Sequence, residues 1–126
     1  MLKLRRVSSD NAGMAWDYER RVGQRYPAAV GLRWHVHGQW GRRRQHAMIV
    51  NISLSGARIR ARVDDAIAIG SLVDIKVRNG RGVVEVRRID ISHDPTMAHY
   101  GVRFVELDVR LKDLVLELTR PNPNTI

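Results

Sequence analysis

Arginine side chains cluster in the segment 19–27, which reads ERRVGQRYP. Arg21 and Arg25 lie four positions apart, and Arg20 adds a third positive charge beside them. Guanidinium groups can donate paired hydrogen bonds to phosphate oxygens, or to the O6 and N7 atoms of guanine. The glycine and the proline of this segment favour a loop over a helix. Taken alone, such a run is more often a solvated basic flank than a binding site.

A second polar segment, 51–56 (NISLSG), has side chains that could bind the edge of a nucleotide base. In an extended chain Asn51 and Ser53 lie on the same face, so both side chains can hydrogen-bond one polar partner. Gly56 permits a tight turn and the close approach of a ligand to the backbone. Asn, Ser and Gly are also common in ordinary hairpin loops, so this segment alone does not identify a site.

The charge of the chain predicts an anionic partner. Its 126 residues include 22 Lys and Arg against 13 Asp and Glu, a formal net charge of +9. Such a charge raises the local concentration of anions around the protein. On charge alone the partner could be DNA, RNA, an acidic membrane face, an acidic protein or a phosphorylated small molecule.

Several classes of function lack the residues that they need. The chain has no cysteine, and no apolar run approaches the roughly 20 residues of a membrane-spanning helix. We therefore expect a cytoplasmic protein without membrane insertion. No recognisable carboxylate pair, phosphate-cradling loop or nucleophile elbow indicates an enzyme, and no cofactor is expected. His35 and His37 share a strand face, but no third ligand can be placed, so no metal site is predicted.

Stepwise alternation of apolar and polar residues predicts six short, half-buried strands. In the third of them, Arg58, Arg60 and Arg62 face away from the apolar side, on which Val63 is also expected to lie. The predicted strands are 29–37, 47–52, 57–63, 72–78, 83–91 and 100–105.

Two places along these strands carry a more specific expectation. Asn79-Gly80 predicts a type I′ hairpin turn, which needs two residues that tolerate positive φ. In the fifth strand the inward alternation breaks after Val86. Either a bulge near Arg87 and Arg88 or an early end of the strand would explain this break.

After the last strand the hydrophobic period becomes that of a helix. An apolar stripe predicts a helix over 108–120, with Asp108 as its N-cap and Pro121 at its end. Together these elements predict an all-β fold with one C-terminal helix, a six-stranded antiparallel β-barrel. One domain is expected over 18–120, between a flexible tail over 1–17 and a short tail over 121–126.

The two polar segments and the strands around them resemble the PilZ family. The shared pattern is a pair of arginines four apart, a strand pair, and then Asn-x-Ser-x-x-Gly before an alternating strand. The stretch 100–105 (YGVRFV) and the terminal helix are similar to the last strand and helix of that family, so the resemblance covers about 18–120. Family members often have Asp where this chain has Asn51. Both side chains accept hydrogen bonds through an oxygen.

The resemblance implies a non-enzymatic receptor or adaptor that binds the bacterial second messenger cyclic di-GMP and changes its surface on binding. In the family, the arginines contact phosphates and a guanine face, and the Asn-x-Ser-x-x-Gly turn holds a guanine edge. A downstream protein partner is also expected. The implied ligand contacts are the motif residues Arg21, Arg25, Asn51, Ser53 and Gly56, with three weaker candidates, Arg20, Arg58 and Arg88. Arg87 is the alternative to Arg88, because the broken alternation of the fifth strand leaves the choice between them open.

Two other functions remain open. A small basic barrel that binds RNA or DNA is supported by the net charge and by the row of arginines in the third predicted strand. It lacks a recognisable platform of aromatic residues for base stacking, so nucleic acid is the less favoured partner. The other alternative is a PilZ-like interaction module that binds no ligand.

Overall fold

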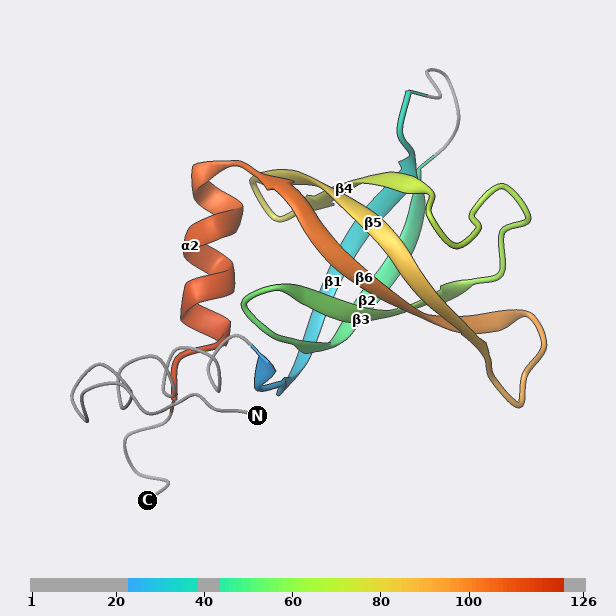
Figure 1. Ribbon diagram of the computed structural model, residues 1–126, viewed down its shortest axis with the longest axis horizontal. Helices are drawn as coiled ribbons and strands as arrows, with labels where there is room; N and C mark the ends of the chain where they lie inside the picture. The colour runs from blue at the N-terminus through green and yellow to red at the C-terminus, as the bar shows by residue number, and fades with distance from the viewer. Residues whose placement is uncertain (1–22, 39–43, 122–126) are drawn as a thin grey trace, which may run out of the picture.

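Six antiparallel strands close into a barrel, and one helix packs against one end of it (Figure 1). The computed structural model describes residues 23–38 and 44–121. Around the barrel the strand order is β1, β2, β3, β6, β5, β4. The predicted six-stranded antiparallel barrel with one C-terminal helix is confirmed. The elements are β1 (Tyr26–Val36), β2 (Gln45–Ile52), β3 (Gly56–Arg62), β4 (Leu72–Val77), β5 (Gly80–Ile91), β6 (Met97–Leu107) and α2 (Val109–Leu118).

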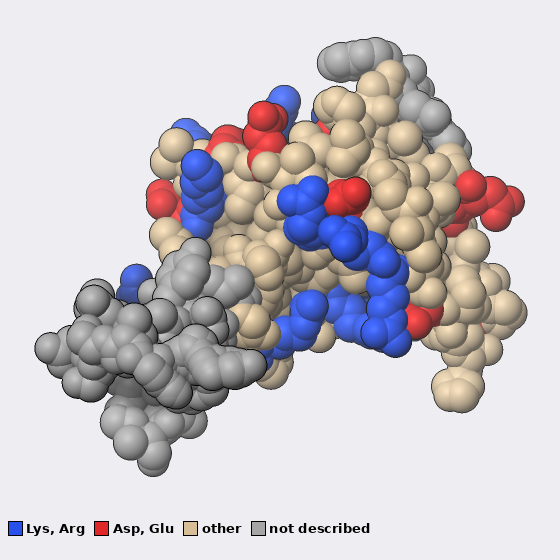
Figure 2. Space-filling view, viewed as in Figure 1, with Lys and Arg blue, Asp and Glu red and all other residues tan. Residues whose placement is uncertain are grey.

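The outer face of β3 is cationic, as its alternation predicts. Arg60 and Arg62 are exposed, whereas Ile59 between Arg58 and Arg60 is 1% exposed. Figure 2 shows Lys and Arg side chains gathered in a band over the side of the barrel that faces the viewer. The expectation that Val63 points inward is wrong, because β3 ends at Arg62 and the Val63 side chain is 37% exposed.

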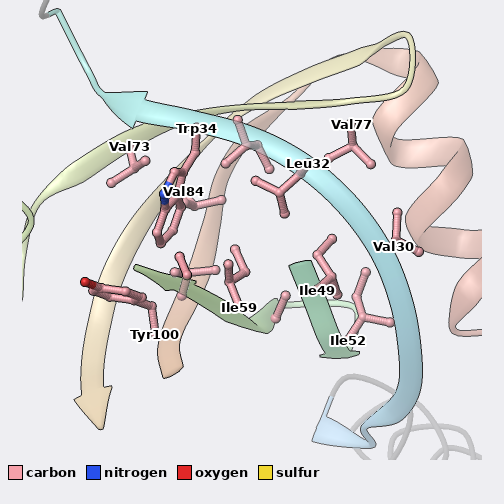
Figure 3. Close-up of a cluster of buried hydrophobic side chains, with 14 of the residues drawn as sticks. Val30, Leu32, Trp34, Ile49, Ile52, Ile59, Val73, Val77, Val84 and Tyr100 are labelled. Carbon is pink, nitrogen blue, oxygen red and sulfur yellow. The ribbon is translucent and has the colours of Figure 1, made fainter. Parts of the chain in front are cut away.

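The interior of the barrel is filled by the inward residues of all six strands (Figure 3). Trp34 from β1 and Tyr100 from β6 meet edge to face across this core, with ring centroids 5.1 Å apart and an interplanar angle of 76°. Both side chains are 1% exposed. Aromatic pairs of this geometry add stabilisation beyond the area that they bury. Val30 and Val77 lie on the side of the core nearest α2.

The β4–β5 hairpin turns one residue earlier than Asn79-Gly80 predicts. Val77 pairs with Gly80, so the two loop residues are Arg78 and Asn79. Positive φ occurs at Arg78, with φ of 55°, and not at Gly80. Glycine is needed at position 80 for space, since a Cβ there would lie 2.8 Å from the backbone nitrogen of Leu111 in α2. The predicted position of the turn is therefore wrong.

A bulge in β5, one of the two expected explanations for its broken alternation, is confirmed. Val86 pairs with Val102 and Arg88 pairs with Gly101, so the register shifts by one residue at Arg87. The strand continues to Ile91 instead of ending early. An extra residue opposite one partner residue is the definition of a bulge. As a result, Arg87 and Arg88 are consecutive and are both exposed.

Helix α2 begins as predicted and ends earlier than expected. The Asp108 side chain accepts a hydrogen bond from the Leu111 backbone N–H at 2.9 Å, as an N-cap does. At the other end the helix stops at Leu118 and Thr119 is its C-cap, two residues before Pro121. The Thr119 hydroxyl donates to the Val115 carbonyl at 2.8 Å, which explains why this buried polar side chain is tolerated.

Candidate functional site

A pocket of about 580 Å³ opens on the outer face of the barrel where β3, β5 and β6 lie side by side. Figure 2 shows the surface on this side hollowed and bordered by Lys and Arg side chains. The pocket combines guanidinium groups with residues that have small side chains or none. The lining residues are Arg25, Asn51, Ser55, Gly56, Arg58, Arg87, Arg88, Gly101, Val102 and Arg103.

Arg25 reaches the pocket from the segment just before β1. It is exposed, and its Nη1 atom donates to Asn51 Oδ1 at 3.0 Å. Asn51 lies near the end of β2, where it pairs with Pro27 of β1 and Arg58 of β3. The structure therefore joins the two polar segments of the sequence through a direct side-chain contact. Gly23 is helical, so the predicted loop is wrong at that residue.

Ser53 lies beneath the pocket and closes the turn between β2 and β3. Its hydroxyl accepts hydrogen bonds from the backbone N–H groups of Ser55 and Gly56 at 3.3 and 3.2 Å. The Ser53 N–H donates to the Gly56 carbonyl at 2.8 Å, and the side chain is only 2% exposed. Ser53 thus shapes the turn, while Ser55, which sequence reasoning did not select, lines the pocket.

Gly56 is fixed by the approach of β6. A Cβ at this position would lie 2.1 Å from the Val102 carbonyl oxygen, a backbone atom that cannot move aside. Gly56 pairs with Arg103 of β6 in the register of the barrel. Glycine is therefore required at this position of the motif by the packing of β6 against the turn.

Asp90 holds two of the predicted arginines together. Its Oδ2 atom lies 3.4 Å from Arg58 Nη1 and 3.1 Å from Arg88 Nε. Arg58 comes from β3 and Arg88 from the bulged part of β5, so one carboxylate bridges two strands that β6 separates. Each guanidinium group keeps further N–H donors beyond the contact with Asp90.

Glu85 contacts two further arginines, Arg87, which the sequence offered as the alternative to Arg88, and Arg103, which was not among the predicted ligand contacts. Its Oε1 atom accepts from Arg103 Nε and Nη2 at 3.0 and 2.9 Å, and lies 3.7 Å from Arg87 Nη1. Arg103 faces outward because Tyr100 and Val102 face the core. That alternation, combined with the pairing of β6 beside β3, was the signal that could have placed Arg103 opposite Gly56, on the face that carries Arg58.

The remaining sequence candidates divide into two groups. Arg20 and Arg21 lie outside the described residues.

His35 and His37 both contact Asp74 of β4, at 3.5 and 2.6 Å. In the part of the chain that the structure describes, no group of three or more His, Cys, Asp or Glu side chains is arranged to hold a metal ion. Across the same residues, no helix combines the length and the hydropathy needed to cross a membrane.

Comparisons with known proteins address the fold and the family. No curated protein matches the chain. Among solved structures, the Bacillus subtilis inhibitor of motility MotI/DgrA is similar, with a TM-score of 0.59 and 14% sequence identity. The match covers 75% of this chain and 47% of that one, so this chain spans about half the length of the solved structure. At this identity the likeness shows the fold alone.

The family is shown by a separate comparison of the sequence. The model of the PilZ domain matches residues 19–120. This range includes all six strands, helix α2 and every residue that lines the pocket between β3, β6 and β5, called the arginine pocket from here on. Because the match spans most of the chain, the protein belongs to the PilZ domain family.

Proposed function

We propose that this chain binds cyclic di-GMP in the arginine-lined pocket and acts as a non-enzymatic receptor. PilZ domains are a family of receptors for this second messenger and are generally non-enzymatic binding domains. One observation carries the proposal for this chain. Arg25, Asn51 and Gly56 of the two motif segments line a single pocket with Arg58 and Arg88.

The charge balance of the pocket suits a ligand with two phosphate groups. Five arginines line it, and the two carboxylates in contact with them, Glu85 and Asp90, offset only part of their charge. Arginine is well suited to phosphate because its planar fork donates two parallel hydrogen bonds. Arg20 and Arg21 would add to this charge from the segment before β1.

Guanine recognition is supported by the pair formed by Arg25 and Asn51. Guanine offers two acceptors, O6 and N7, to an arginine, and donors at its N1 and N2 positions to a side-chain oxygen. Arg25 now donates to the same Asn51 oxygen that such a base would use. Binding would exchange this contact for contacts with the ligand, so the surface around Arg25 changes without any covalent chemistry.

Calorimetric titration with cyclic di-GMP tests the proposal directly. GTP serves as a control for a guanine nucleotide without the cyclic dinucleotide shape, and a short oligonucleotide as a control for general anion binding. We expect saturable binding of cyclic di-GMP that is tighter than that of either control. Binding of the oligonucleotide alone would favour a nucleic-acid protein, and binding of none of the three would favour an interaction module without ligand.

A further inference from the structure

A second basic pocket, of about 350 Å³, lies on the opposite side of the barrel from the arginine pocket. Its lining comes from β1, β2 and β4, whereas the first pocket is centred on β3, β6 and β5. In the closed strand order, β1 and β6 stand three strands apart in either direction. The two pockets share no lining residue. The second is lined by Gly31, Leu32, Arg33, His46, Ala47, Lys76 and Arg78.

Strand register places its basic side chains in a row. Arg33 of β1 pairs with Lys76 of β4 on one side and with His46 of β2 on the other. Lys76 also pairs with Arg81 of β5. Paired residues on neighbouring strands lie about 5 Å apart and point to the same face. The row therefore crosses four strands and presents basic groups to solvent.

Among the described residues, these cations have no carboxylate partners like those in the first pocket. Within residues 23–38 and 44–121, none of the Arg33, Lys76 and Arg78 side chains forms an ion pair. Asp74, the outward residue of β4 two positions before Lys76, is engaged by His35 and His37. An external anion would therefore meet positive charge that the described part of the fold does not neutralise.

We propose that this second pocket binds an acidic segment of a partner protein. The closed barrel offers no free strand edge, so a partner must be recognised through side chains and not by adding a strand. Gly31 lies on the same exposed face of β1 as Arg33 and leaves open space there, since a Cβ at this position would meet nothing within 4 Å. Carboxylates of an acidic segment would pair with the cationic row, and the space over Gly31 would accommodate its backbone.

The lining favours a protein segment over single-stranded nucleic acid. Binding of a single strand generally uses aromatic side chains on which the bases stack. Among the described residues that line this pocket there is no Trp, Tyr or Phe, and the imidazole of His46 is the one aromatic ring. Charge pairing across an exposed interface gives orientation and association rate more than affinity, so the expected contact is weak and sensitive to salt.

The test uses a fluorescein-labelled decaglutamate peptide as the probe, with fluorescence anisotropy at low, fixed salt. The double variant R33E/K76E is compared with K112E/R120E, which makes the same change of net charge at two exposed residues in and after α2. We expect R33E/K76E to bind the peptide about tenfold more weakly, and the control about twofold or less. Backbone NMR shifts caused by the peptide should concentrate in β1, β2 and β4.

Three results separate this proposal from its alternatives. Equal losses in the two double variants would overturn it, because only net charge would then matter. A decathymidine strand that binds the same residues more tightly than the peptide would also overturn it, in favour of nucleic acid. Cyclic di-GMP titration of R33E/K76E should match the unsubstituted protein, so failure of the receptor function would appear separately. Thermal unfolding checks that the variants are folded. If R33E/K76E does not fold, R33Q/K76Q takes its place.

Discussion

At the scale of single residues, the arginines of the first pocket are already oriented before a ligand arrives. Asp90 holds Arg58 and Arg88, and Glu85 holds Arg87 and Arg103. Ordering a long side chain lowers its conformational entropy. Because the ion pairs with these carboxylates already restrict the arginine side chains, ligand binding orders them less. The same carboxylates repel a dianionic ligand. Affinity therefore depends on the donors that each arginine keeps free.

Of the two motif arginines, Arg25 lies within the described residues, and its loss should weaken ligand binding. Arg25→Ala removes charge-assisted hydrogen bonds, so we expect cyclic di-GMP affinity to fall by about 2 kcal/mol or more, about thirtyfold. Arg25 is exposed, so the fold should be unaffected. Lys112→Ala, which removes one charge from the exposed side of α2, is the matched control. Calorimetric titration at fixed salt measures both, and an unchanged affinity for Arg25→Ala would contradict the site.

Gly56 and Gly31 provide a matched pair of substitutions in the barrel. Gly56→Ala places a Cβ against the Val102 carbonyl oxygen, and we expect it to lower the free energy of unfolding by about 3 kcal/mol. Gly31→Ala puts the same methyl group into open space on the outer face, so its effect should stay within about 1 kcal/mol. Urea denaturation measures both. Equal effects of the two substitutions would show that the close approach of β6 is not what requires glycine at position 56.

Most of the described residues that line the first pocket through the two motif segments could be predicted from the sequence, but the direction of some side chains could not. Asn51, Gly56 and Arg58 line the pocket because the motif and the strand alternation place them there. Ser53 was expected on the same face as Asn51, but the chain turns directly after β2 and buries its hydroxyl in the turn. Arg103 was not selected, because its position opposite Gly56 depends on the pairing of β3 with β6, which no local pattern reveals.

At the scale of elements, strand periodicity predicted all six strands and left their ends uncertain. The β5 bulge was one of two readings of a broken alternation, and only the partner strand decides between them. The turn at 78–79 shows the opposite case. Asn79-Gly80 is a strong local signal for a turn, yet Gly80 is required by the packing of α2 against β5, a tertiary contact that competes with the local preference.

The Asp108 side chain joins α2 to the barrel as well as capping the helix. Its two carboxylate oxygens accept from the backbone N–H groups of Leu111 and Arg81, each at 2.9 Å. Asp108→Ala should therefore lower the Tm, because it leaves a helix N-terminus and a strand N–H without a partner. Asp108→Asn keeps one acceptor oxygen for the cap but places an NH2 group against the second backbone N–H, so its Tm should lie between those of Asp108→Ala and the unsubstituted protein. Scanning calorimetry of both variants tests this, and equal Tm losses would show that the cap contributes little.

At the scale of the whole molecule, the described residues form two basic pockets, for which we expect different partners. The first pocket should bind a ligand with two phosphates, and few counterions are released by such a ligand. We therefore expect a shallow dependence of cyclic di-GMP affinity on salt. A single strand that contacts six phosphates would show a slope of about −4 in log K against log salt. Titrations at four salt concentrations measure the slope, and one that steep would favour nucleic acid as the partner.

The stability of the barrel should fall as the pH is lowered, in a window set by His99. Burial lowers the pKa of His99 below its ordinary value of 6.5, and the charges of Arg58 and Arg60 lower it further, against the opposing effect of Asp90. His99 stands between Arg60 on β3 and Asp90 on β5 in the strand register.

The unfolded chain binds a proton at His99 at a higher pH than the folded barrel does. Below about pH 6.5 the unfolded state therefore gains protons first, and the free energy of unfolding falls until the folded-state pKa is passed. His99→Gln removes this titration, so its stability should change less between pH 7.5 and 5.5 than that of the unsubstituted protein.

A second loss of stability is expected only below pH 3.8. There the Asp108 carboxylate, whose pKa is lowered mainly by the Leu111 N–H, becomes protonated and its cap weakens. Urea denaturation at each pH separates the two windows. If His99→Gln loses as much stability between pH 7.5 and 5.5 as the parent protein, another group is responsible for the upper window.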